Sequence, residues 1–218
     1  MYYAIWDYIQ NMKYTNDKSL QAKHYIQPTD VQIHPWRDTV KRVIDITHAL
    51  GGMVLCCPIV LVATIAIKIE SEGPIIFKQE RIGINGKMFT IYKLRTMYQN
   101  ADDKIVQSAK DVRITKTGKI LRKYSIDEIP QLYNILRGDM SLVGPRPLTI
   151  KSFEQRCTKY PNYGIRHTVK PGLCLGTSRE YNTNLGRTER EYIHNRSLIG
   201  DLRIFVKIVQ NVIHGRNF

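Results

Sequence analysis

The sequence predicts an α+β domain attached to one side of a membrane. Residues 49–69 form an apolar run, interrupted only by Lys68, whose length suits a membrane helix of about 20 residues. Two runs rich in Ile, Phe and Tyr then flank Asn85-Gly86, a dipeptide typical of a tight β-hairpin. Helical patterns follow in the second half. We therefore expect a membrane-associated monotopic domain with a re-entrant helical hairpin, a short β-hairpin and several amphipathic interface helices.

The chain divides into three predicted parts. Residues 1–36 are a polar, tyrosine-rich extension that lacks the features of a secretory signal. Residues 37–72 contain the apolar run, and residues 73–218 are expected to form a cytosol-facing domain that ends in an amphipathic helix. The four cysteines suggest neither a disulfide framework nor a zinc site, which favours a reducing compartment.

The charge balance indicates an anionic partner. The chain has 33 Lys and Arg residues against 19 Asp and Glu residues, a formal net charge of +14. Such an excess suits nucleic acid, an anionic membrane surface or phosphorylated substrates. The sequence shows no recognisable motif for reading nucleic acid, and an apolar run like residues 49–69 is unusual in such proteins. We therefore expect the membrane surface and phosphorylated substrates, and no nucleic acid.

The apolar run is interpreted as a re-entrant hairpin rather than a membrane span. Pro58 follows Cys57 at the centre of the run, where a proline bends or breaks a helix. Basic residues flank both ends of the run, and the positive-inside rule places both flanks in the cytoplasm. A segment with both ends on one side must turn back inside the membrane, and Cys57-Pro58 is the predicted turning point. A buried core helix is the alternative.

Basic residues of the second half occupy positions suited to binding phosphate. Lys93 and Arg95 lie two residues apart at the end of the second predicted strand, so they share one face of it. Such a pair could hold a phosphate, although two solvated charges are the more usual interpretation. The triplet Pro145-Arg146-Pro147 fixes the backbone on both sides of a guanidinium, which lowers the entropy lost when that group binds an anion. A rigid surface turn is the alternative.

Asp127 and Glu128 are the strongest chemical signal in the chain. Because proline is tolerated only in the first turn, Pro130 predicts that a helix begins between about Ser125 and Ile129. Either start places both carboxylates at the positive end of that helix. One interpretation is a capping box formed by Ser125 and Glu128. The other is an anionic nucleophile with a neighbouring acid, and the segment alone does not decide between them.

Residues 197–213 predict an amphipathic helix. Apolar residues recur at alternating spacings of four and three, namely Leu198, Leu202, Phe205, Val209 and Val212. The opposite face carries Arg203 and Lys207. Such a helix could lie on the domain core or on an anionic bilayer surface.

The ordered set of motifs resembles the monotopic phosphoglycosyl transferases, a family of bacterial sugar transferases. The resemblance extends from about Lys41 to Ile213 and covers KRVIDI, the Cys-Pro segment, GPIIFKQERIG, YKLRTM, LRKYSIDEIPQLYNILRGDMSLVGPRP and RHTVKPG. It implies an enzyme that moves a sugar 1-phosphate from a UDP-sugar to undecaprenyl (polyprenol) phosphate and releases UMP. It further implies a bacterial inner-membrane protein with a cytoplasmic catalytic domain that initiates exopolysaccharide, capsule or O-antigen biosynthesis. The sequence leaves a homodimer open.

The resemblance also implies roles for individual residues. Asp127 matches the nucleophile, which would form a covalent aspartyl-phosphosugar intermediate in a ping-pong mechanism and bind Mg²⁺. Glu128 would handle a proton or orient the acceptor. The expected substrate-binding residues are Lys93, Arg95, Arg122, Pro145, Arg146, Pro147, Arg179 and Asp201.

One segment departs from the family pattern. Residues 173–189 are shorter than usual and lack the family's aromatic and amide groups. A catalytically degenerate, membrane-anchored scaffold is therefore the alternative to an active enzyme.

Overall fold

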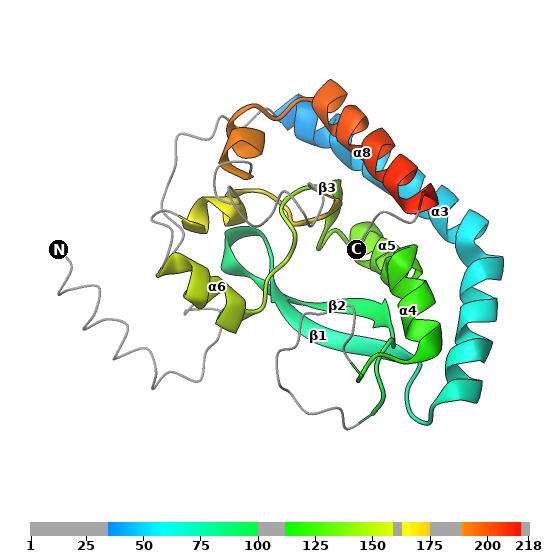
Figure 1. The fold of residues 1–218 in the computed structure, drawn as a ribbon. Coiled ribbons are helices and arrows are strands. Elements are labelled where there is room, and N and C mark those ends of the chain that lie inside the picture. Colours follow the sequence, from blue (N-terminus) through cyan, green and yellow to red (C-terminus); the bar gives the residue numbers. More distant parts are fainter. Residues whose placement is uncertain (1–34, 100–111, 159–162, 175–188, 215–218) are drawn as a thin grey trace.

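The computed structural model describes residues 35–99, 112–158, 163–174 and 189–214 (Figure 1). Residues 1–34 of the predicted extension 1–36 and most of the segment 173–189 lie outside the described residues, and Pro35 and Trp36 already belong to the first described helix. The helices are α3 (Pro35–Glu70), α4 (Lys116–Lys123), α5 (Gln131–Arg137), α6 (Ile150–Cys157) and α8 (Leu198–Ile213). The strands are β1 (Ile76–Ile82), β2 (Met88–Leu94), β3 (Ser141–Val143) and β4 (Gly172–Cys174). Short 3₁₀ helices cover Ile84–Gly86, Ile126–Glu128 and Tyr163–Thr168. This mixture fits the predicted α+β class.

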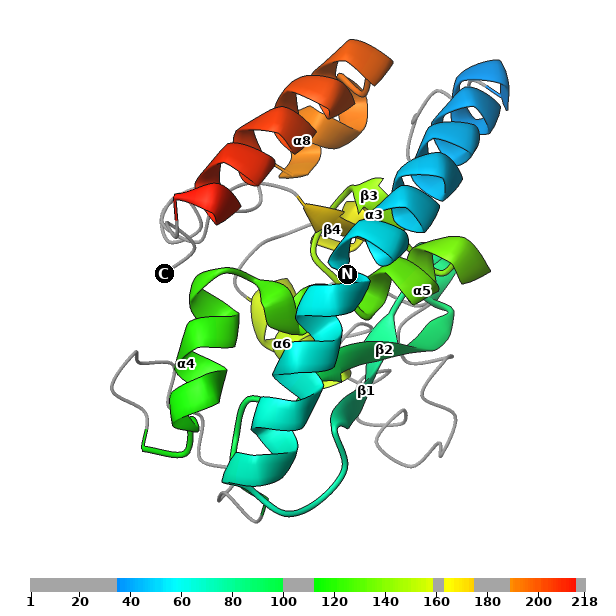
Figure 2. The ribbon, with the colours of Figure 1, turned by 90° about the vertical axis from the view of Figure 1, so that its right-hand side faces the viewer.

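α3 is one helix of 36 residues with Pro58 inside it. It curves along the outside of the domain (Figures 1 and 2). Cys57 and Pro58 lie within the helix rather than at an end of it, and both are exposed. The predicted re-entrant hairpin, in which the chain turns back at Cys57-Pro58, is therefore not confirmed.

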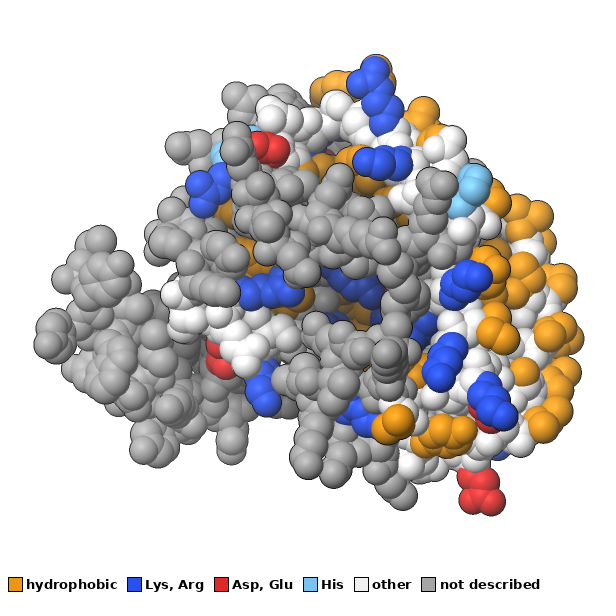
Figure 3. Space-filling model, viewed as in Figure 1, with side chains coloured by type: hydrophobic (Ala, Val, Ile, Leu, Met, Phe, Trp, Pro, Cys, Tyr) orange, Lys and Arg blue, Asp and Glu red, His pale blue; other side chains and the backbone are white. Residues whose placement is uncertain are grey.

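The middle of α3 presents apolar side chains to the outside. Val54 and Leu55 are 75% and 79% exposed, and Figure 3 shows hydrophobic side chains along the edge of the molecule where Figure 1 draws α3. By length and composition α3 could cross a membrane, and its most apolar window is only 11% buried. A core helix would be covered by protein, so that alternative does not fit the described residues.

Both ends of α3 are tied to the same domain. Near the first end, Arg42 donates hydrogen bonds of 2.6 and 2.8 Å to two carbonyls in the last turn of α5. At the other end, the Glu70 carboxylate accepts hydrogen bonds of 2.6 and 2.8 Å from the backbone N–H groups of Lys116 and Thr117 in the first turn of α4. Both contacts satisfy backbone groups that a helix end leaves without a partner. α3 thereby holds α4 and α5, and the chain between them, in place.

The β-hairpin forms as predicted. β1 and β2 are antiparallel, and Ile82 and Met88 are the last residue pair before the turn. Asn85 and Gly86 both have positive φ, 53° and 74°, a conformation that Asn and Gly adopt more readily than other residues. The turn is longer than a two-residue connection, because Ile84–Gly86 form a 3₁₀ turn between the strands.

A buried amide docks α5 on the hairpin. Asn134 is 0% exposed; it donates a hydrogen bond of 2.7 Å to the Thr90 carbonyl and accepts one of 3.2 Å from the Tyr92 N–H. The core around it contains Ile91 of β2 and Ile135 of α5. This contact sets the distance between β2, which carries Lys93, and the chain that enters α5.

β3 and β4 form a small parallel pair, with Ser141 opposite Gly172. The backbone at Gly172 also approaches the residue that follows β3, so closely that a Cβ atom on Gly172 would lie 2.1 Å from the Gly144 nitrogen. Glycine is therefore required there, because no side chain fits. The contact sets the starting point of the Pro145-Arg146-Pro147 loop, which begins directly after Gly144.

α8 is a helix as predicted, and only part of the predicted apolar stripe packs on the domain. Phe205 packs on the core and contacts the His48 ring edge-on, with the two ring centroids 5.4 Å apart. Leu202 and Val209, which were expected on the same face, are 58% and 40% exposed. The helix carries a second apolar stripe, at positions 199, 202, 206, 209 and 213, so the periodicity alone could not show which stripe faces the domain.

Candidate active site

Asp127 and Glu128 lie in the 3₁₀ turn Ile126–Glu128, between α4 and α5. The predicted capping box is not formed. Ser125 has a left-handed backbone with φ of 52° and makes no side-chain capping bond, and α5 begins only at Gln131 after Pro130. The acidic pair thus lies in a 3₁₀ turn between two α-helices, not in the first turn of an α-helix.

Two cations hold the Glu128 carboxylate. Lys93 Nζ lies 2.6 Å from one carboxylate oxygen, and the Arg146 guanidinium binds both oxygens. The Glu128 side chain is 14% exposed. Burial alone would raise its pKa, but Arg146 and Lys93 outweigh burial and lower the pKa to about 2. Glu128 is therefore ionised at neutral pH, with both oxygens engaged.

Asp127 has a different environment, although it is the next residue. It is 7% exposed, and none of the described residues forms a hydrogen bond with its carboxylate. Burial and the negative charge of Glu128 raise its pKa, while Lys93, Arg122 and Arg146 act in the opposite direction. Asp127 is thus surrounded by positive charge but keeps its oxygens available. Adjacent carboxylates in such unequal environments are suited to different roles.

The predicted phosphate-binding residues come together only in part. Lys93 and Arg146 meet at Glu128, and Arg122 lies close enough to act on Asp127 while its Nε donates a 2.9 Å hydrogen bond to Thr96. Arg95 has other partners: its guanidinium donates to the backbone carbonyls of Ser71 and Glu72 at 2.7 and 2.6 Å. Arg95 therefore joins the end of α3 to the hairpin, and one phosphate site shared by Lys93 and Arg95 is not supported.

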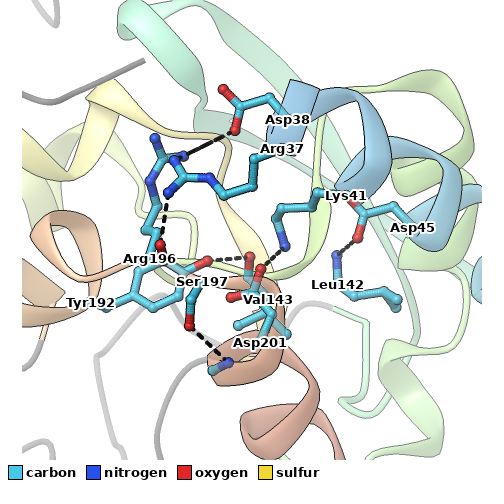
Figure 4. Close-up of polar contacts among 11 residues, drawn as sticks. Arg37, Asp38, Lys41, Asp45, Leu142, Val143, Tyr192, Arg196, Ser197 and Asp201 are labelled. Atoms are coloured by element: carbon cyan, nitrogen blue, oxygen red, sulfur yellow. Dashed lines mark hydrogen bonds and ion pairs between the residues drawn. The ribbon is translucent and has the colours of Figure 1, made fainter. Parts of the chain in front are cut away.

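Asp201 belongs to a separate cluster at the first turns of α3 (Figure 4). Its carboxylate lies 2.7 Å from Lys41 Nζ, and Arg37 donates a 2.7 Å hydrogen bond to the Arg196 carbonyl nearby. These contacts fasten α8 to the first turns of α3. The predicted substrate-binding role of Asp201 gains no support from this position, and Arg179 lies outside the described residues.

Sequence reasoning missed two arginines beside the Pro145-Arg146-Pro147 loop. Arg166 is 2% exposed and donates a hydrogen bond to the Arg146 carbonyl. Arg81 donates one of 3.2 Å to the Pro147 carbonyl, and burial together with Arg146 lowers its pKa to about 10. Both lie in motifs that carried the family resemblance, QERIG and RHTVKPG, which is the one sequence signal that could have singled them out.

Comparison with known proteins gives a family. A sequence model described as Bacterial sugar transferase matches residues 36–215. The chain belongs to the bacterial sugar transferase family. This sugar transferase is 40% identical over 188 residues to a UDP-glucose:undecaprenyl-phosphate glucose-1-phosphate transferase of Caulobacter vibrioides, covering 81% of this chain and 70% of that protein.

Two further relatives show the range of lengths within the family. The sugar transferase is 40% identical over 182 residues to an uncharacterized sugar transferase of Bacillus subtilis, covering 80% of this chain and 87% of that protein. It is 38% identical over 186 residues to a UDP-N-acetylgalactosamine-undecaprenyl-phosphate N-acetylgalactosaminephosphotransferase of Aeromonas hydrophila, covering 81% of this chain. The match spans only 44% of the Aeromonas protein.

Proposed function

We propose that this sugar transferase moves a sugar 1-phosphate from a UDP-sugar to undecaprenyl phosphate and releases UMP, the first membrane step in the assembly of an exopolysaccharide, capsule or O-antigen. The names of the relatives support this reaction. The observation that carries it for this chain is the inequality of the acidic pair: Glu128 is held by two cations, whereas Asp127 is buried among the same cations with its oxygens available.

The geometry suits a covalent mechanism in two halves. An Asp127 oxygen attacks the sugar-linked phosphorus of the donor, the bond from this phosphorus to the bridging oxygen breaks, and UMP leaves with that oxygen. The carboxylate then carries the phosphosugar. A phosphate oxygen of the acceptor attacks the same phosphorus and releases Asp127, leaving a polyprenyl diphosphate sugar. Lys93, Arg122 and Arg146 offset the negative charge that an anionic nucleophile meets at a diphosphate.

Glu128 is assigned to positioning rather than to proton transfer. A carboxylate with a pKa of about 2 and both oxygens bound to cations is a weak base at neutral pH. The acceptor does not need one, because a phosphate monoester with a second pKa of about 6 is already largely ionised. Glu128 instead holds Lys93 and Arg146 at the site.

Asp127 fits a Mg²⁺ ion better than Glu128 does. Mg²⁺ in phosphoryl-transfer sites takes one or two carboxylates together with substrate phosphates and water. Among the described residues there is no cluster of three or more His, Cys, Asp and Glu side chains that could hold a metal by itself. Asp127 would therefore share the ion with the donor diphosphate, where Mg²⁺ supplies neutralisation of the phosphate charge.

We also propose that α3 enters the bilayer from the cytoplasmic side without crossing it. Its two ends contact α5 and α4, and through them one domain. A straight span would separate these contacts by the thickness of a membrane, about 30 Å of hydrocarbon. A bend at Pro58 would let the exposed middle of α3 enter one leaflet while the ends stay with the domain. The predicted hairpin thus remains a proposal about the membrane-bound state.

Leu55→Glu tests this membrane contact. A charge placed on the apolar middle of a membrane helix costs about 3 kcal/mol, so binding to vesicles should fall roughly a hundredfold. Val112→Glu is the control, because Val112 is 88% exposed and lies outside α3. Flotation with anionic and neutral vesicles at high salt measures the membrane binding of both variants. Equal flotation of the Leu55 variant and the parent protein would contradict the proposal.

The reaction is tested by UMP release from detergent-purified protein with a panel of UDP-sugars, Mg²⁺ and undecaprenyl phosphate. Omitting the acceptor should leave a phosphosugar on the peptide that contains Asp127, detected by its mass. Asp139→Asn is the control for Asp127→Asn, since Asp139 pairs with Arg137 away from the acidic pair. Folded protein that binds nucleotide but releases no UMP from any donor would favour the catalytically degenerate scaffold.

A further inference from the structure

The Pro145-Arg146-Pro147 loop is held by two buried or partly buried arginines from different parts of the chain. Arg166, from the 3₁₀ turn Tyr163–Thr168, donates to the Arg146 carbonyl. Arg81, from β1, donates to the Pro147 carbonyl at 3.2 Å. Successive carbonyls of the loop are therefore fixed, while the Arg146 side chain is 48% exposed and its guanidinium reaches Glu128.

We propose that Arg166 and Arg81 are positioning residues that aim Arg146 at the acidic pair, and that Glu189 keeps Arg166 in place. This inference rests on the proposed function. Arg166 and Glu189 form an ion pair of 3.2 Å in which the two side chains are 2% and 5% exposed. A buried guanidinium without a counterion is strongly unfavourable. The Glu189 carboxylate is thus what allows a charged group to sit behind the loop.

Arg166 makes contacts at this position that a lysine could not make. Its guanidinium contacts the Tyr163 hydroxyl, the Arg146 carbonyl and the Glu189 carboxylate. These three partners are reached by the two terminal nitrogens of the guanidinium, whereas an ammonium is a point charge on a flexible stem. Arg166→Lys therefore keeps the buried positive charge and removes the set of contacts that the guanidinium makes.

The loop geometry matters because the Arg146 side chain is long and about half exposed. A partly exposed arginine stabilises a developing charge only if its backbone is already placed, since otherwise ordering the side chain offsets the gain. Arg146 reaches Glu128 and also acts on Asp127. Displacing a catalytic group by about 1 Å can cost about a hundredfold in rate. Arg166 and Arg81 are placed to prevent such a displacement.

The first test measures the loop itself and needs no activity. In Arg166→Lys, hydrogen exchange of the peptide over residues 143–149 should rise by about tenfold while that of α5 stays unchanged. Arg156→Lys is the matched control: Arg156 donates to the same Tyr163 hydroxyl at 3.0 Å and forms no hydrogen bond or ion pair with the described residues of the loop. Unchanged exchange in the Arg166 variant would overturn the proposal, as would an equal rise in the Arg156 variant.

The second test asks whether Arg166 acts through Arg146. Arg166→Lys should lower kcat for UMP release by about tenfold to a hundredfold with KM for the donor within about threefold. In an Arg146→Ala background the same change should cost less than about twofold, because the group being positioned is gone. Equal losses in both backgrounds would assign Arg166 a merely structural role and overturn the proposal.

Glu189→Gln provides a second variant, since it leaves the arginine in place. It should reproduce both the rise in hydrogen exchange of the loop and the loss of kcat. Melting temperatures identify any variant that fails to fold. If the parent protein releases no UMP with any donor, the proposed function fails, while the exchange experiment still decides whether Arg166 holds the loop.

Discussion

Two clusters of acidic and basic side chains, one at the first turns of α3 and one around the acidic pair, differ in how their charges are paired. In the cluster at the first turns of α3, Asp201 is bound by Lys41 and the neighbouring arginines bind backbone and carboxylate groups (Figure 4). In the acidic-pair cluster, three cations surround two carboxylates, and only Glu128 is bound by them. The same residue types thus produce a fastening in one place and a reactive site in the other.

The difference teaches that the number of charges does not identify a site; the pairing does. Burying a carboxylate without a hydrogen-bond donor is costly, and proteins keep such groups mainly where they serve a function. In the acidic-pair cluster, Asp127 is such a group. Removing charges from each cluster should therefore have opposite consequences for activity and for stability.

Asp127→Asn should have the largest effect. It removes the nucleophile, so kcat for UMP release should fall by about 10⁴-fold or more. Because burial and Glu128 raise the pKa of Asp127, the ionised carboxylate is a cost to the folded state, and the neutral amide should leave the melting temperature equal or higher. UMP release and thermal unfolding measure the two. An active variant, or one that loses stability like an ordinary buried substitution, would remove the contrast between the clusters.

Glu128→Gln should have the next largest effect, about a hundredfold in kcat, because Lys93 and Arg146 lose the charge that places them. Its stability effect depends on pH. The pKa of Glu128 is depressed from 4.5 to about 2, so its stabilising contribution is present above about pH 4.5 and is lost as the pH falls toward 2. The difference in unfolding free energy between the parent and the variant should shrink in that window. A difference that stays constant from pH 6 to pH 3 would contradict this pairing of Glu128.

Asp201→Asn should have the smallest effect on activity. Lys41 would lose its counterion in a site where the two side chains are 17% and 13% exposed, which costs about 1–3 kcal/mol of stability. Well below the melting temperature, kcat should stay within about threefold. Urea unfolding together with UMP release checks this. A loss of kcat near that of Glu128→Gln would restore Asp201 to the substrate site.

Local conformation was predictable where a few neighbouring residues decide it. Asn85 and Gly86 adopt the left-handed turn because their own side chains permit it. The helix over residues 198–213 follows from its apolar period, although that period did not reveal which of two stripes packs on the domain. The acidic pair was found from its motif, and the structure places Lys93 and Arg146 beside it.

The family, the β-hairpin, the helix over residues 198–213, the apolar middle of α3 and the identity of the acidic pair follow from the order of residues along the chain. The tertiary structure decided which carboxylate is bound and which is available. Lys93 and Arg146 reach Glu128 from positions 35 and 18 residues away, and Arg166 reaches the Arg146 carbonyl from 20 residues away. Asp127 and Glu128 are neighbours with the same local signals, and only groups distant in sequence, brought close in a low-dielectric interior, make their charges unequal.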